Sequence, residues 1–119
     1  MTSQKPVGLS RIMKAVQYSL AGMKAAWKHE AAFRQEAVAL AVLMPLGLFI
    51  GQTNIERAVL ILSLMIVILT ELLNSAIEAV VDRTGLDYHP MAARAKDMGS
   101  AAVFVSIVSV IIVWTLILI

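Results

Sequence analysis

Three long stretches with almost no charged side chains decide what this chain can fold into. The last of them, Met98 to Ile119, holds 22 residues without a charge, which is enough for one α-helix to cross a bilayer. Residues 37–55 are also uncharged, and a helix that begins near Ala31 reaches spanning length. Residues 58–81 form a third apolar run, which contains two carboxylates. The sequence therefore predicts an all-α membrane protein with three transmembrane helices, at about 31–51, 54–84 and 91–119.

The composition agrees with a membrane protein and excludes several other classes. Of the 119 residues, 60 % are hydrophobic and only 15 % are charged. A soluble globule of this size cannot bury so much apolar surface, and a disordered chain would be far more polar. The absence of cysteine excludes a disulfide framework, a zinc–thiolate site and a thiol nucleophile. Residues 1–119 are expected to form one integral membrane domain.

Local signals mark the ends of the expected spans. Thr53 and Glu56 have the spacing of a capping box, which predicts the start of the second span. Gly85 is expected to end that helix as its C-cap, and Pro90 suits the first turn of the next helix. Pro45 lies inside the first span, where it is expected to bend the helix.

Residues 6–28 precede the first span and have the pattern of an amphipathic helix. Apolar side chains recur there at helical spacing, at Leu9, Ile12, Met13, Val16, Leu20, Met23 and Trp27. Most Lys and Arg residues of this segment lie off that stripe. We therefore expect a basic helix that lies flat on the cytoplasmic membrane surface. The alternative is a helix that packs against the bundle without a role toward lipid.

The positions of Lys and Arg also predict the orientation of the chain. Nine of these ten residues lie in residues 1–36 and 82–97, while the turn of residues 52–57 contains only Arg57. The chain crosses the membrane twice between residues 1–36 and residues 82–97, so these two segments lie on the same side of the membrane. Because basic segments stay in the cytoplasm, the N-terminus is expected there and the C-terminus outside.

The second span carries a stripe of polar residues. Glu71, Asn74, Ser75, Glu78 and Asp82 are spaced so that they share one face of a helix. A carboxylate in hydrocarbon costs several kcal/mol, so we expect this face to meet the bundle interior, a water-filled cleft, a cation or a metal. The alternative is that these acids form structural ion pairs with Lys or Arg of a neighbouring helix.

Depth along the helix separates the two glutamates. Measured from Arg57, Glu71 lies roughly 21 Å and Glu78 roughly 31 Å along the helix at about 1.5 Å per residue. Glu71 is therefore expected in the cytoplasmic half of the bilayer and Glu78 near its interface. Glu30 is expected to reach the same interface, where two carboxylates suit a magnesium ion. Glu36 is expected to pair instead with a basic neighbour, Arg34 or Lys28.

The loop after the second span and the start of the third supply further polar groups. Tyr88 and His89 are suited to flank a flat base, and Lys96 to contact a phosphate. Each also has a plainer explanation, as a solvated loop residue or a charge-balancing pair. Walker A, Rossmann glycine and protein-kinase motifs are absent from the sequence. The two histidines are too isolated for a zinc site, and the basic patch beside three spans indicates a membrane surface rather than nucleic acid.

The stretch E-L-L-N-S-A-I-E-A-V-V-D, from Glu71 to Asp82, closely resembles the signature of the small integral membrane diacylglycerol kinases of prokaryotes. Other blocks match in the same order: R-I-M-K-A from Arg11, E-A-A-F-R-Q-E from Glu30 and R-A-K-D-M-G-S-A-A-V from Arg94. The second of these resembles the Gram-negative type, whereas the related undecaprenol kinases differ there. Asp87 stands where relatives often have glutamate, which bears on the nucleotide contacts of the loop.

The resemblance implies a fold and a reaction. It implies a homotrimer of three-span subunits with a surface helix, whose active sites are shared between neighbouring subunits. The reaction transfers the γ-phosphoryl group of MgATP to the hydroxyl of diacylglycerol and gives phosphatidic acid, in phospholipid recycling. The expected location is the cell inner membrane, with the N-terminus in the cytoplasm and the C-terminus in the periplasm.

The resemblance also implies roles for individual residues. Glu71 is the expected general base, Glu30 and Glu78 are the expected magnesium ligands, and Asn74 supports the Glu71 region. The expected ATP-binding residues are Arg11, Tyr18, Glu30, Glu78, Asp87, Tyr88, His89, Lys96 and Asp97. The expected lipid-binding residues are Arg11, Ser19, Lys24, Trp27, Gln35, Glu71 and Ser100.

Other functions remain open at this stage. An undecaprenol kinase of the same family would have the same architecture. A small proton-coupled transporter also uses intramembrane glutamates, but it predicts more spans and a glutamate nearer the midplane. A structural subunit would use the polar stripe only to select helix partners.

Overall fold

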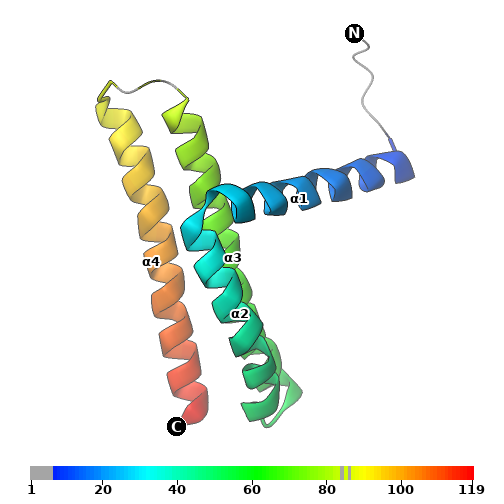
Figure 1. Ribbon diagram of the computed structural model, residues 1–119. Helices are drawn as coiled ribbons and strands as arrows, with labels where there is room; N and C mark the ends of the chain where they lie inside the picture. Colours follow the sequence, from blue (N-terminus) through cyan, green and yellow to red (C-terminus); the bar gives the residue numbers. More distant parts are fainter. Residues whose placement is uncertain (1–6, 84, 86) are drawn as a thin grey trace.

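The computed structural model describes residues 7–83, 85 and 87–119. It contains four α-helices, which in chain order are α1 (Leu9–His29), α2 (Ala31–Ile50), α3 (Asn54–Asp82) and α4 (Pro90–Leu118). Helices α2, α3 and α4 run along one another as an elongated bundle, and α1 crosses it and extends away (Figure 1). The expected first residue of the N-terminal helix, Pro6, the expected last residue of the second span, Thr84, and the basic residue Lys5 lie outside the described residues.

Three of the four helices are long and apolar enough to cross a membrane, namely α2, α3 and α4. This confirms the expected all-α architecture with three apolar helices of spanning length. Many large apolar side chains of these helices are exposed in the single chain, including Phe49 on α2, Leu73 on α3 and Phe104 on α4. A lone chain in water could not leave this surface uncovered, so the exposure agrees with a membrane protein.

The helix ends follow from local capping chemistry. The Thr53 hydroxyl accepts a hydrogen bond from the Glu56 backbone N–H at 3.1 Å, which confirms the expected start of α3. His89 Nδ1 accepts from the Met91 N–H at 3.1 Å, and Pro90 is the first residue of α4. The expected C-cap was wrong. Helix α3 ends at Asp82 with Arg83 as its cap, and Gly85 lies in the following turn with a φ of +112°.

Helix α3 is the centre of the bundle because it packs against both α2 and α4 and also meets the end of α1. Its buried apolar side chains are Leu60, Leu64 and Val67. Two polar contacts tie α3 to α4: Trp114 Nε1 donates to Ser63 Oγ at 3.2 Å, and Thr70 Oγ1 donates to Ser106 Oγ at 3.0 Å. In the described part of the chain, no Cα atom of α1 lies within 8 Å of a Cα atom of α4. Residues of α1 and α4 therefore do not meet across one subunit through close backbone packing.

Candidate active site

The polar stripe of α3 changes from buried to exposed along the helix. Glu71 is only 4 % exposed, and Asn74 and Ser75 are also buried. One turn further, Glu78 is half-buried, and Asp82 at the end of the helix is exposed. The stripe therefore leads from the interior of the bundle to the end of α3 where the loop to α4 begins. Such a gradient suits a site that meets a buried group at one end and a water-soluble group at the other.

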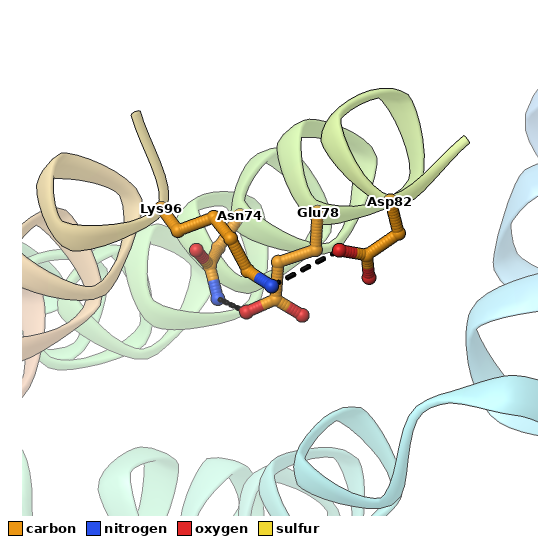
Figure 2. A network of polar contacts seen from close by, with 4 residues as sticks. All are labelled: Asn74, Glu78, Asp82 and Lys96. Atoms are coloured by element: carbon orange, nitrogen blue, oxygen red, sulfur yellow. Dashed lines mark hydrogen bonds and ion pairs between the residues drawn. The ribbon is translucent and has the colours of Figure 1, made fainter. Parts of the chain in front are cut away.

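A short network of polar contacts occupies the open end of the stripe (Figure 2). The Asn74 amide donates to Glu78 Oε1 at 3.3 Å, and Lys96 Nζ on α4 lies 3.0 Å from Asp82 Oδ1. The side chains of Lys96 and Asp82 are 43 % and 64 % exposed. Within residues 7–83, 85 and 87–119 this is the one ion pair between carboxylates and basic groups. Glu71 and Glu78 are therefore not held in the structural ion pairs that the alternative explanation requires.

Glu36 of α2 faces Glu71 of α3. The two carboxyl groups lie close enough to interact directly. Arg34 does not pair with Glu36 as expected, because its Nη1 donates to the backbone carbonyls of Trp27 at 2.7 Å and Lys28 at 3.3 Å. The expected ion pair of Glu36 with Arg34 or Lys28 was thus wrong, because Arg34 instead ties α2 to the end of α1.

A cavity of about 590 Å³ lies between α1 and α3. Its walls are mostly apolar or small, and its polar groups come from Ser19, His29, Glu30 and Ser75. The Ser75 hydroxyl is buried and has no hydrogen-bond partner. A mostly apolar space with a few converging polar groups is the form expected of a site for a lipid headgroup and the start of its chains.

A second, more polar cavity of about 360 Å³ lies where α3, the loop and α4 meet. Four of the residues expected to bind ATP line it together: Asp87, Tyr88, His89 and Lys96. Asp82 also lines it, and accepts the Lys96 contact described above. The structure thus brings an aromatic ring, an imidazole and a cation to one open recess, which is chemistry suited to a base and a phosphate.

The described residues contain no cluster of three or more His, Asp or Glu side chains that could by itself hold a metal ion. Glu30 and Glu78 both lie near enough to Glu71 to act on it electrostatically. Their carboxylate oxygens are hard donors, and neither is in an ion pair. A pair of carboxylates outside any ion pair fits a magnesium ion that takes its other ligands from water and phosphate.

Comparison with known proteins decides the family. The family model for prokaryotic diacylglycerol kinase matches residues 17–118. The chain belongs to the prokaryotic diacylglycerol kinase family. The diacylglycerol kinase of Escherichia coli K12 is 50 % identical over 111 residues, which cover 93 % of this chain and 91 % of that protein. Those of Pseudomonas aeruginosa and Haemophilus influenzae are 48 % and 47 % identical, over 93 % and 92 % of this chain and 90 % and 93 % of those proteins.

In this member of the prokaryotic diacylglycerol kinase family, the single chain does not gather all the expected site residues in one place. Arg11 and Tyr18 lie on α1, and neither lines the cavity beside α4. Several others are exposed and line neither cavity: Lys24, Trp27, Gln35, Asp97 and Ser100. The nucleotide and lipid sets are therefore only partly assembled within a single chain.

Three residues beside the site were not singled out as site residues from the sequence. Ser75 lines the first cavity, Glu36 faces Glu71, and Gly99 of α4 lies against the Asn74 side chain. The signal for Glu36 was its place directly before the uncharged residues 37–55, where a carboxylate at bilayer depth is costly. Nothing in the sequence alone indicated Gly99.

Proposed function

We propose that this chain is an ATP-dependent lipid kinase that transfers the γ-phosphoryl group of MgATP to the hydroxyl of diacylglycerol. The product is phosphatidic acid, which returns to phospholipid synthesis. The observation that supports this most is the placement of the buried Glu71 on a stripe that runs from beside an apolar cavity to a polar, open one. The family to which the chain belongs has curated members named diacylglycerol kinase.

Glu71 acts as the general base. Its carboxylate accepts the proton of the lipid hydroxyl while the hydroxyl oxygen forms a bond to the γ-phosphorus and the bond to the β-phosphate oxygen breaks. ADP leaves as the other product. Burial of Glu71 within the bundle keeps water from competing with the lipid hydroxyl as the acceptor. Asn74 supports this region through its hydrogen bond to Glu78.

Glu30 and Glu78 are the residues that would hold magnesium. A bound magnesium ion would offset the charge on the phosphate oxygens during transfer. Lys96, Asp97, Asp87, Tyr88 and His89 bind the nucleotide, together with Arg11 and Tyr18. Lys96 is held by Asp82 through an exposed contact that a phosphate can replace at small cost.

The lipid-binding residues are Arg11, Ser19, Lys24, Trp27, Gln35, Ser100 and Glu71. The apolar residues of the α1 stripe, from Leu9 to Trp27, are all exposed in the single chain. That exposure supports a position of α1 on the cytoplasmic surface of the membrane. Basic residues of α1 then lie beside anionic headgroups.

A homotrimer completes the site. Because the Cα atoms of α1 and α4 stay more than 8 Å apart in the described chain, the α1 residues of one subunit would join the α4 residues of its neighbour. The exposed apolar faces of α2, α3 and α4 would be covered by lipid and by the other subunits. The trimer lies in the inner membrane, with the N-terminus cytoplasmic and the C-terminus periplasmic. Residues 1–119 act as one integral membrane domain.

The test is an assay of the purified protein in mixed micelles with labelled ATP, magnesium and diacylglycerol. We expect labelled phosphatidic acid. Undecaprenol offered in parallel identifies the lipid, because an undecaprenol kinase would label that alcohol in preference. Labelling of neither alcohol would contradict the proposal and favour a transporter or a structural subunit.

A further inference from the structure

Glu36 presents a feature that the proposed reaction does not use. It lies in the second turn of α2, and its side chain is partly buried against α3. Its Oε2 atom is fully buried and has no hydrogen-bond partner in the structure. A buried polar atom without a partner costs free energy comparable to a lost hydrogen bond, and such atoms are rare in native proteins. The position therefore calls for a reason beyond packing.

The group that Glu36 faces is the carboxyl of Glu71. The two belong to different helices, so their approach is set by the packing of α2 on α3. The nearest basic side chain on α2, Arg34, is bound to the Trp27 and Lys28 carbonyls and does not neutralise the pair. Two ionised carboxylates in this arrangement repel each other, and the pair becomes attractive once at least one of them carries a proton.

We infer that Glu36 is a positioning residue, which holds the Glu71 carboxyl in the orientation needed to reach the substrate hydroxyl. This inference rests on the proposed role of Glu71 as general base. The pair holds one proton and one negative charge before reaction. Glu71 accepts the proton of the lipid hydroxyl, so the pair then holds two protons and no charge, until one proton leaves to solvent.

The reason for a contact between Glu36 and the general base is geometric. A general base must lie within hydrogen-bonding distance of the proton that it takes, and a glutamate side chain has three rotatable bonds. A contact from a second helix fixes that side chain more firmly than its own helix can. Glu36 is well placed for this contact. It lies near the start of α2, close to the junction between α1 and α2 that also contains Glu30.

Two substitutions test the inference. Glu36→Leu removes the contact but keeps the volume, whereas Glu36→Gln keeps an amide that donates to Glu71. We expect Glu36→Leu to lower kcat by about tenfold or more, which is part of the roughly 10²–10⁴-fold that general acid–base catalysis contributes, with the KM for MgATP nearly unchanged. Glu36→Gln should recover much of that loss. Glu56→Gln, on the capping box of α3, is the matched control and should keep the wild-type kcat.

A double-mutant cycle separates positioning from a direct role of Glu36. Glu71→Asp already displaces the base, so Glu36→Leu should cost several-fold less kcat in that background than in the wild type. An equal cost in both backgrounds, or a wild-type kcat for Glu36→Leu, would overturn the inference. A rise in the KM for MgATP in both Glu36 variants would also overturn it, because that result indicates a metal ligand. Circular dichroism and gel filtration in detergent establish that the variants fold. If Glu36→Leu does not fold, Glu36→Ala, which also removes the carboxyl group, takes its place with the same expected loss of kcat.

The test also distinguishes failure of this inference from failure of the proposed function. If Glu71→Gln turns over normally, Glu71 is not the base, whatever Glu36 does. If Glu71→Gln is inactive and Glu36→Leu is normal, only the role of Glu36 is refuted.

Discussion

Single side chains on one face of α3 have different environments, although they lie within about three helical turns of one another. Glu71 is enclosed by the bundle, Glu78 is half-buried, and Asp82 is exposed and touches Lys96. Burial strengthens electrostatic interactions and excludes water, whereas exposure allows exchange of partners. The same residue type can thus serve as a base at one position and as a nucleotide or metal contact at the next.

Replacing Glu71 tests the base directly. Glu71→Gln keeps the size of the side chain but cannot accept the substrate proton. We expect transfer to fall by at least about 10²-fold, the lower end of the contribution of general base catalysis, while the oligomer stays folded. The measurement is the labelled-ATP assay together with gel filtration in detergent. Turnover near the wild-type level would exclude Glu71 as the base.

Glu78→Ala tests the proposed magnesium contact. The change removes one hard oxygen ligand and the acceptor of the Asn74 amide. We expect binding of MgATP by titration calorimetry to weaken, while binding of ATP with EDTA changes little because no metal is then present. An unchanged affinity for MgATP would remove Glu78 from the metal site. Chelation of magnesium should likewise stop transfer by the wild type.

Substitutions of Lys96 and of Asp82 should have different effects, although the two side chains contact each other. Lys96→Ala removes a proposed phosphate contact, so we expect the KM for MgATP to rise. Asp82→Asn removes only an exposed ion-pair partner, so thermal stability should be nearly unchanged. Steady-state kinetics and thermal unfolding measure the two effects. A large loss of stability in Asp82→Asn would show that the pair is structural.

The stripe on α3 could be predicted because the spacing of its residues fixes a common helix face. The partner of Glu36 could not. Arg34 and Lys28 are closer in sequence, and the choice between them and Glu71 depends on how α2 is rotated against α3. Helix rotation is set by packing between elements that are separate in the sequence, and α2 gives little periodic signal for it because residues 37–50 are almost uniformly apolar.

At the scale of helices, the seam between α3 and α4 holds the polar network in place. Gly99 of α4 is buried, and the Asn74 side chain lies where a Cβ atom at position 99 would be. Asn74 Oδ1 is buried there without a hydrogen-bond partner, while the amide nitrogen reaches Glu78. The missing side chain of Gly99 thus permits the orientation of Asn74 that supports Glu78.

Gly99→Ala should therefore disturb the site from the neighbouring helix. The added methyl forces Asn74 to move, and overpacking of this kind costs about 1–3 kcal/mol. We expect lower thermal stability and a higher KM for MgATP. Gly22→Ala on α1 is a control for stability, because no atom lies within 4 Å of the position of its added methyl. A Gly99→Ala variant as stable and active as the wild type would show that Asn74 is free to adjust.

The positions of the helices were the feature of the structure that the sequence predicted best. The length of the apolar runs predicted the three spans, and Thr53 and Pro90 predicted two helix starts. The end of α3 was less predictable, because Arg83 caps the helix and Gly85 serves the turn. The crossing of α1 over the bundle could not be derived, since it depends on contacts such as that of Arg34 with the α1 carbonyls.

For the molecule as a whole, the single chain contains two cavities, each lined by only part of the proposed site residues. The cavity between α1 and α3 and the cavity beside α4 are lined by different sets of residues. Arg11 and Tyr18 lie on α1, while Lys96 lies on α4. If all of them bind the same nucleotide, the two groups must come from different subunits. A shared site therefore follows from the separation of α1 and α4 together with the proposed roles.

Subunit mixing tests this sharing. One variant carries Arg11→Ala and Tyr18→Ala on α1, and the other carries Lys96→Ala on α4. Each should be nearly inactive alone. When both are co-expressed in equal amounts and assemble at random, about a quarter of the shared sites combine an intact α1 with an intact α4. Activity should then recover to about that fraction of the wild type. A site formed within one chain would recover nothing, since every chain carries one defect, and mixing the separately assembled trimers controls for activity that does not require co-assembly.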